Sequence, residues 1–96
     1  MIKNISAGMT QEYRVCLQNQ ATAFHIRTAG YTDAMLRVYV DGNEVVTTTI
    51  ARTGGMDNWA TTSCVLAAAQ QPVSGMHIVK LEWLSGSVLF SAFSLK

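Results

Sequence analysis

The chain has 96 residues, which is enough for one domain, and 49% hydrophobic against 14% charged residues excludes a disordered tail. A formal net charge of +1 without any run of Lys or Arg argues against a nucleic-acid partner or an anionic membrane surface. No apolar stretch reaches the roughly 20 residues that a membrane span needs. We therefore expect a single domain over residues 1–96, with no nucleic-acid and no membrane partner.

Alternating apolar and polar residues predict a series of short strands along the chain. In Ala34–Val40, for example, Leu36, Val38 and Val40 fall on one face and Met35, Arg37 and Tyr39 on the other. The residues 1–6 could add an edge strand, and no segment has the period of a helix. The predicted strands are Glu12–Gln18, Ala21–Thr28, Ala34–Val40, Glu44–Ile50, Ala60–Ala67, His77–Trp83 and Val88–Leu95.

The most secure local feature is the Asp41-Gly42-Asn43 turn between two of these strands. An Asp-Gly pair between alternating runs predicts a hairpin, because both turn residues tolerate positive φ. Seven or eight short strands at this spacing are typical of an all-β antiparallel sandwich of jelly-roll type. The expected core contains Val15, Leu17, Phe24, Ile26, Leu36, Val38, Val79, Leu81 and Phe90.

The segment Thr53-Gly54-Gly55-Met56-Asp57-Asn58-Trp59 reads as an exposed loop between two strand-like runs. Two interpretations of Met56, Asp57 and Asn58 stay open: a ligand-facing loop tip, or a connection whose polar residues are merely hydrated. We expect Trp59 to pack at the rim of the core rather than to serve as a sugar platform. Trp83, in phase with Val79 and Leu81, should lie in the core.

A second loop precedes the hairpin and contains Tyr31 and Asp33. These residues could supply an aromatic platform and an acceptor for a hydroxyl, although exposed Tyr and Asp are also common in loops without a function. Tyr39 lies either on a solvated sheet face or on a binding face, and its direction alone does not decide.

Candidates for catalysis and for metal binding are missing from the sequence. His25 and His77 are distant from one another, and no nucleophile elbow or close acidic pair occurs. Cys16 and Cys64 are too few for a disulfide framework and too isolated from the histidines for zinc. We expect them to be buried free thiols, with a single bridge as the alternative. The sequence thus predicts no enzyme, no cofactor and no metal site.

The order of the motifs resembles that of family-6 carbohydrate-binding modules over nearly the whole chain. The Gly-Gly-x-x-x-Trp loop and the Val-Asp-Gly hairpin are the most specific parts of this likeness. The segments that carry it are Glu12-Tyr13-Arg14-Val15, Phe24-His25-Ile26-Arg27, Leu36-Arg37-Val38-Tyr39-Val40-Asp41-Gly42, Thr53–Trp59, Gly75-Met76-His77 and Leu89-Phe90-Ser91-Ala92-Phe93.

The resemblance implies a β-sandwich related to the galactose-binding folds, attached to secreted glycoside hydrolases. It therefore implies an extracellular location, although residues 1–15 contain no apolar segment of a signal peptide. The family has further N-terminal strands, usually with an acidic residue that helps hold calcium, and this chain starts after them. One sheet should accordingly lack an edge strand.

The resemblance also implies a sugar site of aromatic faces and an asparagine, from which this chain departs. Met56 stands at the usual tryptophan, Asn4 and Thr10 at other aromatic positions, and Ser91 at the asparagine. Methionine is apolar but offers no flat face for a sugar ring.

Two functions from different classes follow from these observations. The first is a non-catalytic module that binds a polysaccharide or oligosaccharide through loops at the end of the sandwich, using Tyr31, Asp33, Gly55, Met56, Asp57, Asn58 and Ser91. The second is a protein–protein or oligomerisation module, in which a homo-oligomer forms through the uncovered N-terminal sheet edge.

Overall fold

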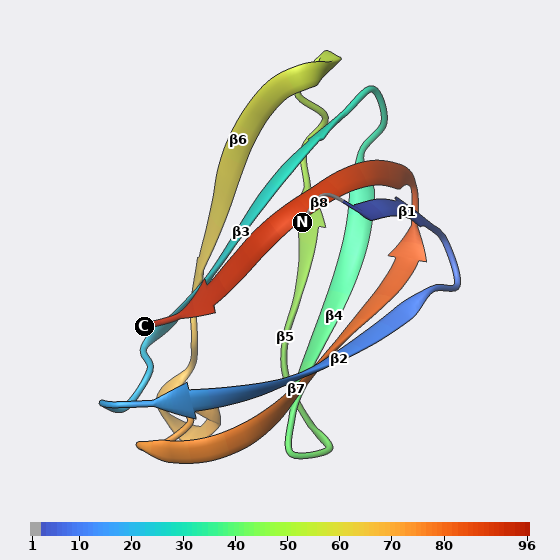
Figure 1. The fold of residues 1–96 in the computed structure, drawn as a ribbon. Coiled ribbons are helices and arrows are strands. Elements are labelled where there is room, and N and C mark those ends of the chain that lie inside the picture. The colour runs from blue at the N-terminus through green and yellow to red at the C-terminus, as the bar shows by residue number, and fades with distance from the viewer. Residues whose placement is uncertain (1–2) are drawn as a thin grey trace.

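The computed structural model describes residues 3–96, which form eight strands and one short 3₁₀ turn at Ala68–Gln70 (Figure 1). The expectation of seven or eight strands without a helix is confirmed in these residues, and none of their helical segments could cross a bilayer. The strands are β1 (Lys3–Ser6), β2 (Thr10–Leu17), β3 (Ala23–Gly30), β4 (Ala34–Val40), β5 (Asn43–Ile50), β6 (Gly55–Val65), β7 (Gly75–Ser85) and β8 (Ser87–Leu95).

The strands form two four-stranded antiparallel sheets that pack face to face. The first sheet has the order β1-β8-β3-β6 and the second the order β2-β7-β4-β5. Most strands therefore pair with strands distant in sequence, which is the connectivity expected of a jelly roll. The predicted all-β sandwich is confirmed.

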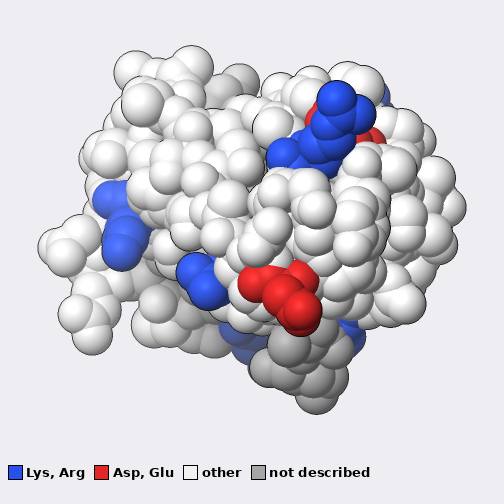
Figure 2. All heavy atoms as spheres, turned by 90° about the horizontal axis from the view of Figure 1, so that it is seen from above, with Lys and Arg blue, Asp and Glu red and all other residues white. Residues whose placement is uncertain are grey.

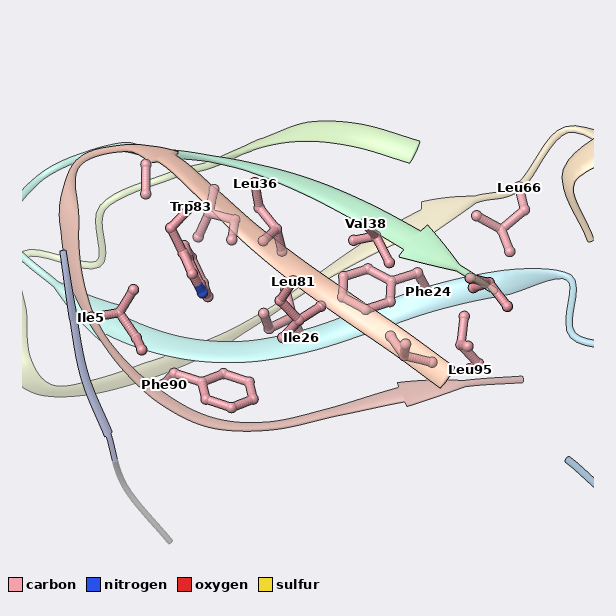
Figure 3. Packing of buried hydrophobic residues seen from close by; sticks show 14 of the residues in the cluster. Ile5, Phe24, Ile26, Leu36, Val38, Leu66, Leu81, Trp83, Phe90 and Leu95 are labelled. Atoms are coloured by element: carbon pink, nitrogen blue, oxygen red, sulfur yellow. The ribbon is translucent and has the colours of Figure 1, made fainter. Parts of the chain in front are cut away.

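The hydrophobic core lies between the sheets, because each strand directs alternate side chains inward (Figure 3). Trp83 is 1% exposed, and its Nε1–H donates to Oε1 of the buried Gln11 at 3.0 Å. The prediction for Trp83 is thus confirmed, as are the predicted core residues apart from Val15. Val15 is only half-buried, because β2 is the edge strand of its sheet.

The Asp41-Gly42 turn has the conformation that its sequence predicts. Asp41 has φ 52° and Gly42 has φ 85°, so both turn residues lie in the left-handed region.

A different constraint acts at Gly86, between β7 and β8. A Cβ atom there would lie 2.3 Å from the carbonyl oxygen of Asp33, so only glycine fits.

Both cysteines are free thiols, but the expectation that they are buried is wrong. Cys16 is exposed because it lies on the outward face of β2, opposite in phase to the buried Leu17. Cys64 is half-buried because β6 is an edge strand, which leaves one side of this residue uncovered.

The N-terminal edge of the first sheet is covered over part of its length. The strand β1 pairs Lys3 to Ser6 with Phe90 to Ser87. Beyond Phe90, residues 92–95 of β8 pair with β3 alone among the described residues. Residues 1–2, which belong to the predicted edge strand, lie outside the described part of the chain.

At the end of the sandwich that holds the Asp41-Gly42 turn, His77 joins three segments. Its Nδ1 lies 2.5 Å from Oδ2 of Asp41, and its Nε2 lies 2.6 Å from the carbonyl oxygen of Val73. The other oxygen of Asp41 accepts the backbone N–H of Ile78 at 2.9 Å. Since both ring nitrogens face acceptors, only the protonated imidazole satisfies both.

We expect the free energy of unfolding to fall as the pH rises above neutrality. The hydrogen bond to Asp41, followed by that to Val73, raises the pKa of His77 above its ordinary value of 6.5. This stabilisation is complete below pH 6.5 and disappears as the pH rises through the raised pKa. The pKa of Asp41 is lowered by the Ile78 N–H and then by His77, so its contribution is lost only in acid.

Urea unfolding from pH 5 to pH 9 measures this dependence. His77→Gln should be less stable than the parent near pH 5.5 and should approach it at pH 9, whereas His25→Gln should parallel the parent. A parent and a His77→Gln variant that differ equally at all pH values would contradict the assignment.

Candidate sugar-binding site

The loop predicted at Thr53–Trp59 is partly a bulged strand. The ladder between β3 and β6 runs without interruption to Thr28 opposite Ala60 and resumes at Gly30 opposite Gly55. The four residues Met56–Trp59 therefore stand opposite the single residue Ala29. A bulge of this size removes them from the regular ladder, and the start of β6 extends beyond the other strands at the upper end of the molecule (Figure 1).

Thr53 and Gly30 hold two loops together at this end. The Gly30 carbonyl oxygen accepts the backbone N–H groups of Thr53 at 3.0 Å and Gly54 at 3.1 Å. In return, Oγ1 of Thr53 accepts the Gly30 N–H at 3.1 Å and lies 3.0 Å from the Gly55 carbonyl oxygen. Because Tyr31 follows Gly30 directly, these bonds place the Tyr31 loop beside the Met56–Trp59 bulge.

Six of the seven predicted site residues come to this end. Tyr31 is 64% exposed, and Met56, Asp57 and Asn58 are exposed on the bulge. Asp33 uses Oδ1 to accept the backbone N–H of Arg52 at 2.9 Å, so it braces the loop while its other oxygen stays free of protein partners in the described residues.

Gly55 is the buried member of this group. A Cβ atom at Gly55 would lie 3.1 Å from Nδ2 of Asn58, so the Asn58 amide rests over the Gly55 backbone. The lack of a side chain at Gly55 makes room for Asn58.

Ser91 lies apart from this group. It is the additional residue of a bulge in β8, where Arg27 pairs with Ala92 and Thr28 with Phe90. Ser91 lines a hollow of about 330 Å³ beside β1 and β2, together with Lys3, Tyr13, Phe90, Ala92 and Phe93.

Trp59 does not pack against the core, so the prediction for it is wrong. It is half-buried on the bulge, and the Arg27 guanidinium lies 5.5 Å from the centre of its ring. The bulge interrupts the alternation of inward and outward side chains along β6, and the Trp59 side chain therefore points outward. Sequence reasoning missed Arg27 as its partner, because the contact depends on the register between β3 and β6.

Tyr39 lies on the outer face of the second sheet. Its hydroxyl donates to Oε1 of Glu82 at 3.0 Å, and Arg37 lies 3.3 Å from the same oxygen. The side chain of Tyr39 is therefore occupied by a network within this face.

The charges at the upper end are few and scattered (Figure 2).

The family-6 resemblance implies a structural calcium, but the residues present do not fit one. Within residues 3–96, no three His, Cys, Asp or Glu side chains lie close enough to hold a metal ion.

A sequence model described as carbohydrate binding module (family 35) matches residues 1–95. The chain belongs to this family of carbohydrate-binding modules. It is a non-catalytic binding module, which confirms the expectation that it is not an enzyme. No curated protein matches the module in sequence.

Solved family-6 modules share its fold. One from Clostridium stercorarium, solved with cellobiose, is 21% identical with a TM-score of 0.81, over 96% of this chain and 70% of that one. A second, from Clostridium cellulolyticum with xylose, is 21% identical with a TM-score of 0.79, over 96% and 74% of the chains. A β-1,3-glucan-binding module from Bacillus halodurans is 19% identical with a TM-score of 0.80, over 97% and 75%. The family-6 resemblance is confirmed in the fold.

We expect Thr53→Val to loosen the join between the two loops. The substitution keeps the shape of the side chain but leaves the Gly30 N–H without its acceptor, which should lower the free energy of unfolding by about 1–2 kcal/mol. Amide hydrogen exchange at Gly30 and Gly54 should accelerate as well. Thr49→Val, on the exposed face of β5, is the matched control. Unchanged exchange at both amides would show that the hydroxyl does not hold the loops.

Proposed function

We propose that the module binds a polysaccharide through the upper end of the sandwich, at the Tyr31 loop and the Met56–Trp59 bulge. The observation that carries the proposal is the set of hydrogen bonds between the Gly30 backbone and Thr53 and Gly54, which join the segment leading to the exposed Tyr31 to the segment leading to the exposed bulge. Loops on a rigid scaffold are the usual location of binding residues.

The side chains at this end have the chemistry that a sugar requires. The C–H groups of one sugar face stack on an aromatic ring, and Tyr31 is the most exposed of the large apolar side chains at this end. The carboxylate of Asp57 and the amide of Asn58 can accept or donate hydrogen bonds to hydroxyls, and Asp33 can accept one with its free oxygen. Met56 adds apolar contact without a flat face.

This arrangement predicts a shallow site with modest affinity, because a single exposed ring supplies the stacking. The solved modules of similar fold were studied with cellobiose, with xylose and as a β-1,3-glucan binder. Cellulose-type glucans, xylans and β-1,3-glucans are therefore the first ligands to test on this module.

A second candidate is pairing of another strand with the part of β8, residues 92–95, whose outer edge has no partner among residues 3–96. A free strand edge is a template for an added strand, and the apolar hollow beside Tyr13 and Phe93 could receive one of its side chains. The occupant considered is a second copy of the chain. Light scattering at increasing concentration tests this candidate, and a strict monomer would exclude it.

Affinity electrophoresis in gels that contain soluble cellulose derivatives, xylan or β-1,3-glucan tests the sugar proposal. Tyr31→Ala should weaken binding about 2- to 12-fold, the loss of one stacking contact. Met56→Trp should strengthen it by a similar factor, because it adds a second flat face.

Val65→Ala is the control, since Val65 is 85% exposed at the far end of β6. If neither the parent nor Met56→Trp is retarded by any of these polysaccharides, the proposal is wrong. If Val65→Ala weakens binding as much as Tyr31→Ala, the site lies elsewhere.

A further inference from the structure

The outer edge of β6, which is the edge turned away from β3, has no partner strand among residues 3–96. The strand β6 therefore forms one border of the first sheet. An unpaired border exposes a row of backbone N–H and C=O groups, and these groups can pair with a strand of another molecule. Folded proteins commonly block such pairing with charged side chains, with proline or with bulges.

The border strands differ in these protective features. The strand β1 contains Lys3, and β2, which borders the second sheet, contains Glu12 and Arg14. In β6, by contrast, residues 58–65 include no charged residue and no proline. The bulge at Met56–Trp59 disturbs the beginning of β6 and leaves the rest of the strand without protection.

The unprotected part of β6, Ala60–Val65, is a regular and accessible strand. Its residues pair one to one with residues 23–28 of β3 without interruption. The side chains of Thr61 and Ser63 are exposed, and that of Val65 is 85% exposed. Threonine and valine favour the extended conformation, so this segment keeps the shape that an added strand requires.

The backbone groups that point away from β3 belong to Thr61, Ser63 and Val65. Leu66 donates its N–H to the Thr22 carbonyl oxygen at 2.8 Å, on the side of β3. The residues that bond to a neighbouring antiparallel strand alternate along the chain. The three residues at odd positions consequently direct their N–H and C=O groups to the outer edge.

We infer that the outer edge of β6 is a surface for self-association, on which the β6 strand of a second copy pairs antiparallel. A two-fold axis at Ser63 sets this residue opposite its counterpart, and sets Thr61 opposite Val65 of the second copy. All the outward backbone groups of these residues then have partners. Because the paired segments contain no charge, β6 is complementary to itself without any repulsion between like charges.

The pairing is confined to Thr61–Val65, because the bulge precedes this segment and β6 ends after it. Such a small interface predicts a weak dimer that dissociates on dilution. This border is separated by β3 from residues 92–95 of β8, so the two edges offer different sites for a second copy. The inference does not depend on the proposed sugar binding.

Sedimentation equilibrium up to millimolar concentration, with a reducing agent to keep both cysteines as thiols, tests the inference. The parent should show an equilibrium of monomer and dimer. Ser63→Lys sets two ammonium groups opposite each other and should raise the dissociation constant of the dimer roughly 5-fold. Ser63→Ala loses the same contact with Nδ1 of His25 but adds no charge, so it should associate like the parent.

Two further lysine variants are matched controls at other strand borders. Thr49→Lys adds the same charge on β5, and Ala92→Lys adds it on β8; both positions are exposed. Both variants should associate like the parent. In the parent, amide hydrogen exchange at Thr61, Ser63 and Val65 should slow as the protein concentration rises.

A parent that stays monomeric at millimolar concentration would overturn the inference. Association that Thr49→Lys or Ala92→Lys weakens as much as Ser63→Lys would overturn it as well, because the contact would then involve another border or the net charge. Sugar binding by a strictly monomeric parent would leave the proposed function in place.

Discussion

The backbone of Gly30 is the point at which the upper end of this module is assembled. Its carbonyl oxygen accepts two N–H groups from Thr53 and Gly54, and its own N–H is bound by the Thr53 hydroxyl. Tyr31 leaves β3 directly after this point, and Gly55 begins β6 directly after its partners. The two segments that carry the exposed polar and aromatic side chains are consequently held in one place by these hydrogen bonds between them.

The frame itself could be predicted from local sequence. The alternation in Ala34–Val40 and the Asp41-Gly42 turn each determine their structure within a few residues, and both agree with the strands observed. The bulge at Met56–Trp59 could not be predicted in this way, because it results from the register between β6 and β3. For the same reason the exposure of Trp59 and its contact with Arg27 were missed. The exposure of Cys16 depends instead on the outward face of an edge strand.

The two outer sheet faces give the module two kinds of surface. On the outer face of the second sheet, Arg37 forms ion pairs with Glu44 and Glu82, so the charge of Arg37 is already balanced by neighbouring side chains. The upper end and the adjoining face of the first sheet leave Tyr31, the bulge and Arg27 without such partners among the described residues.

Chemical-shift mapping of the backbone amides during titration with a soluble cellulose derivative, xylan or β-1,3-glucan tests this account most directly. The account predicts that the polysaccharide that binds shifts the amides of Tyr31 and of Met56–Trp59. Shifts concentrated at Tyr39, Lys80 and Glu82, on the outer face of the second sheet, would contradict it.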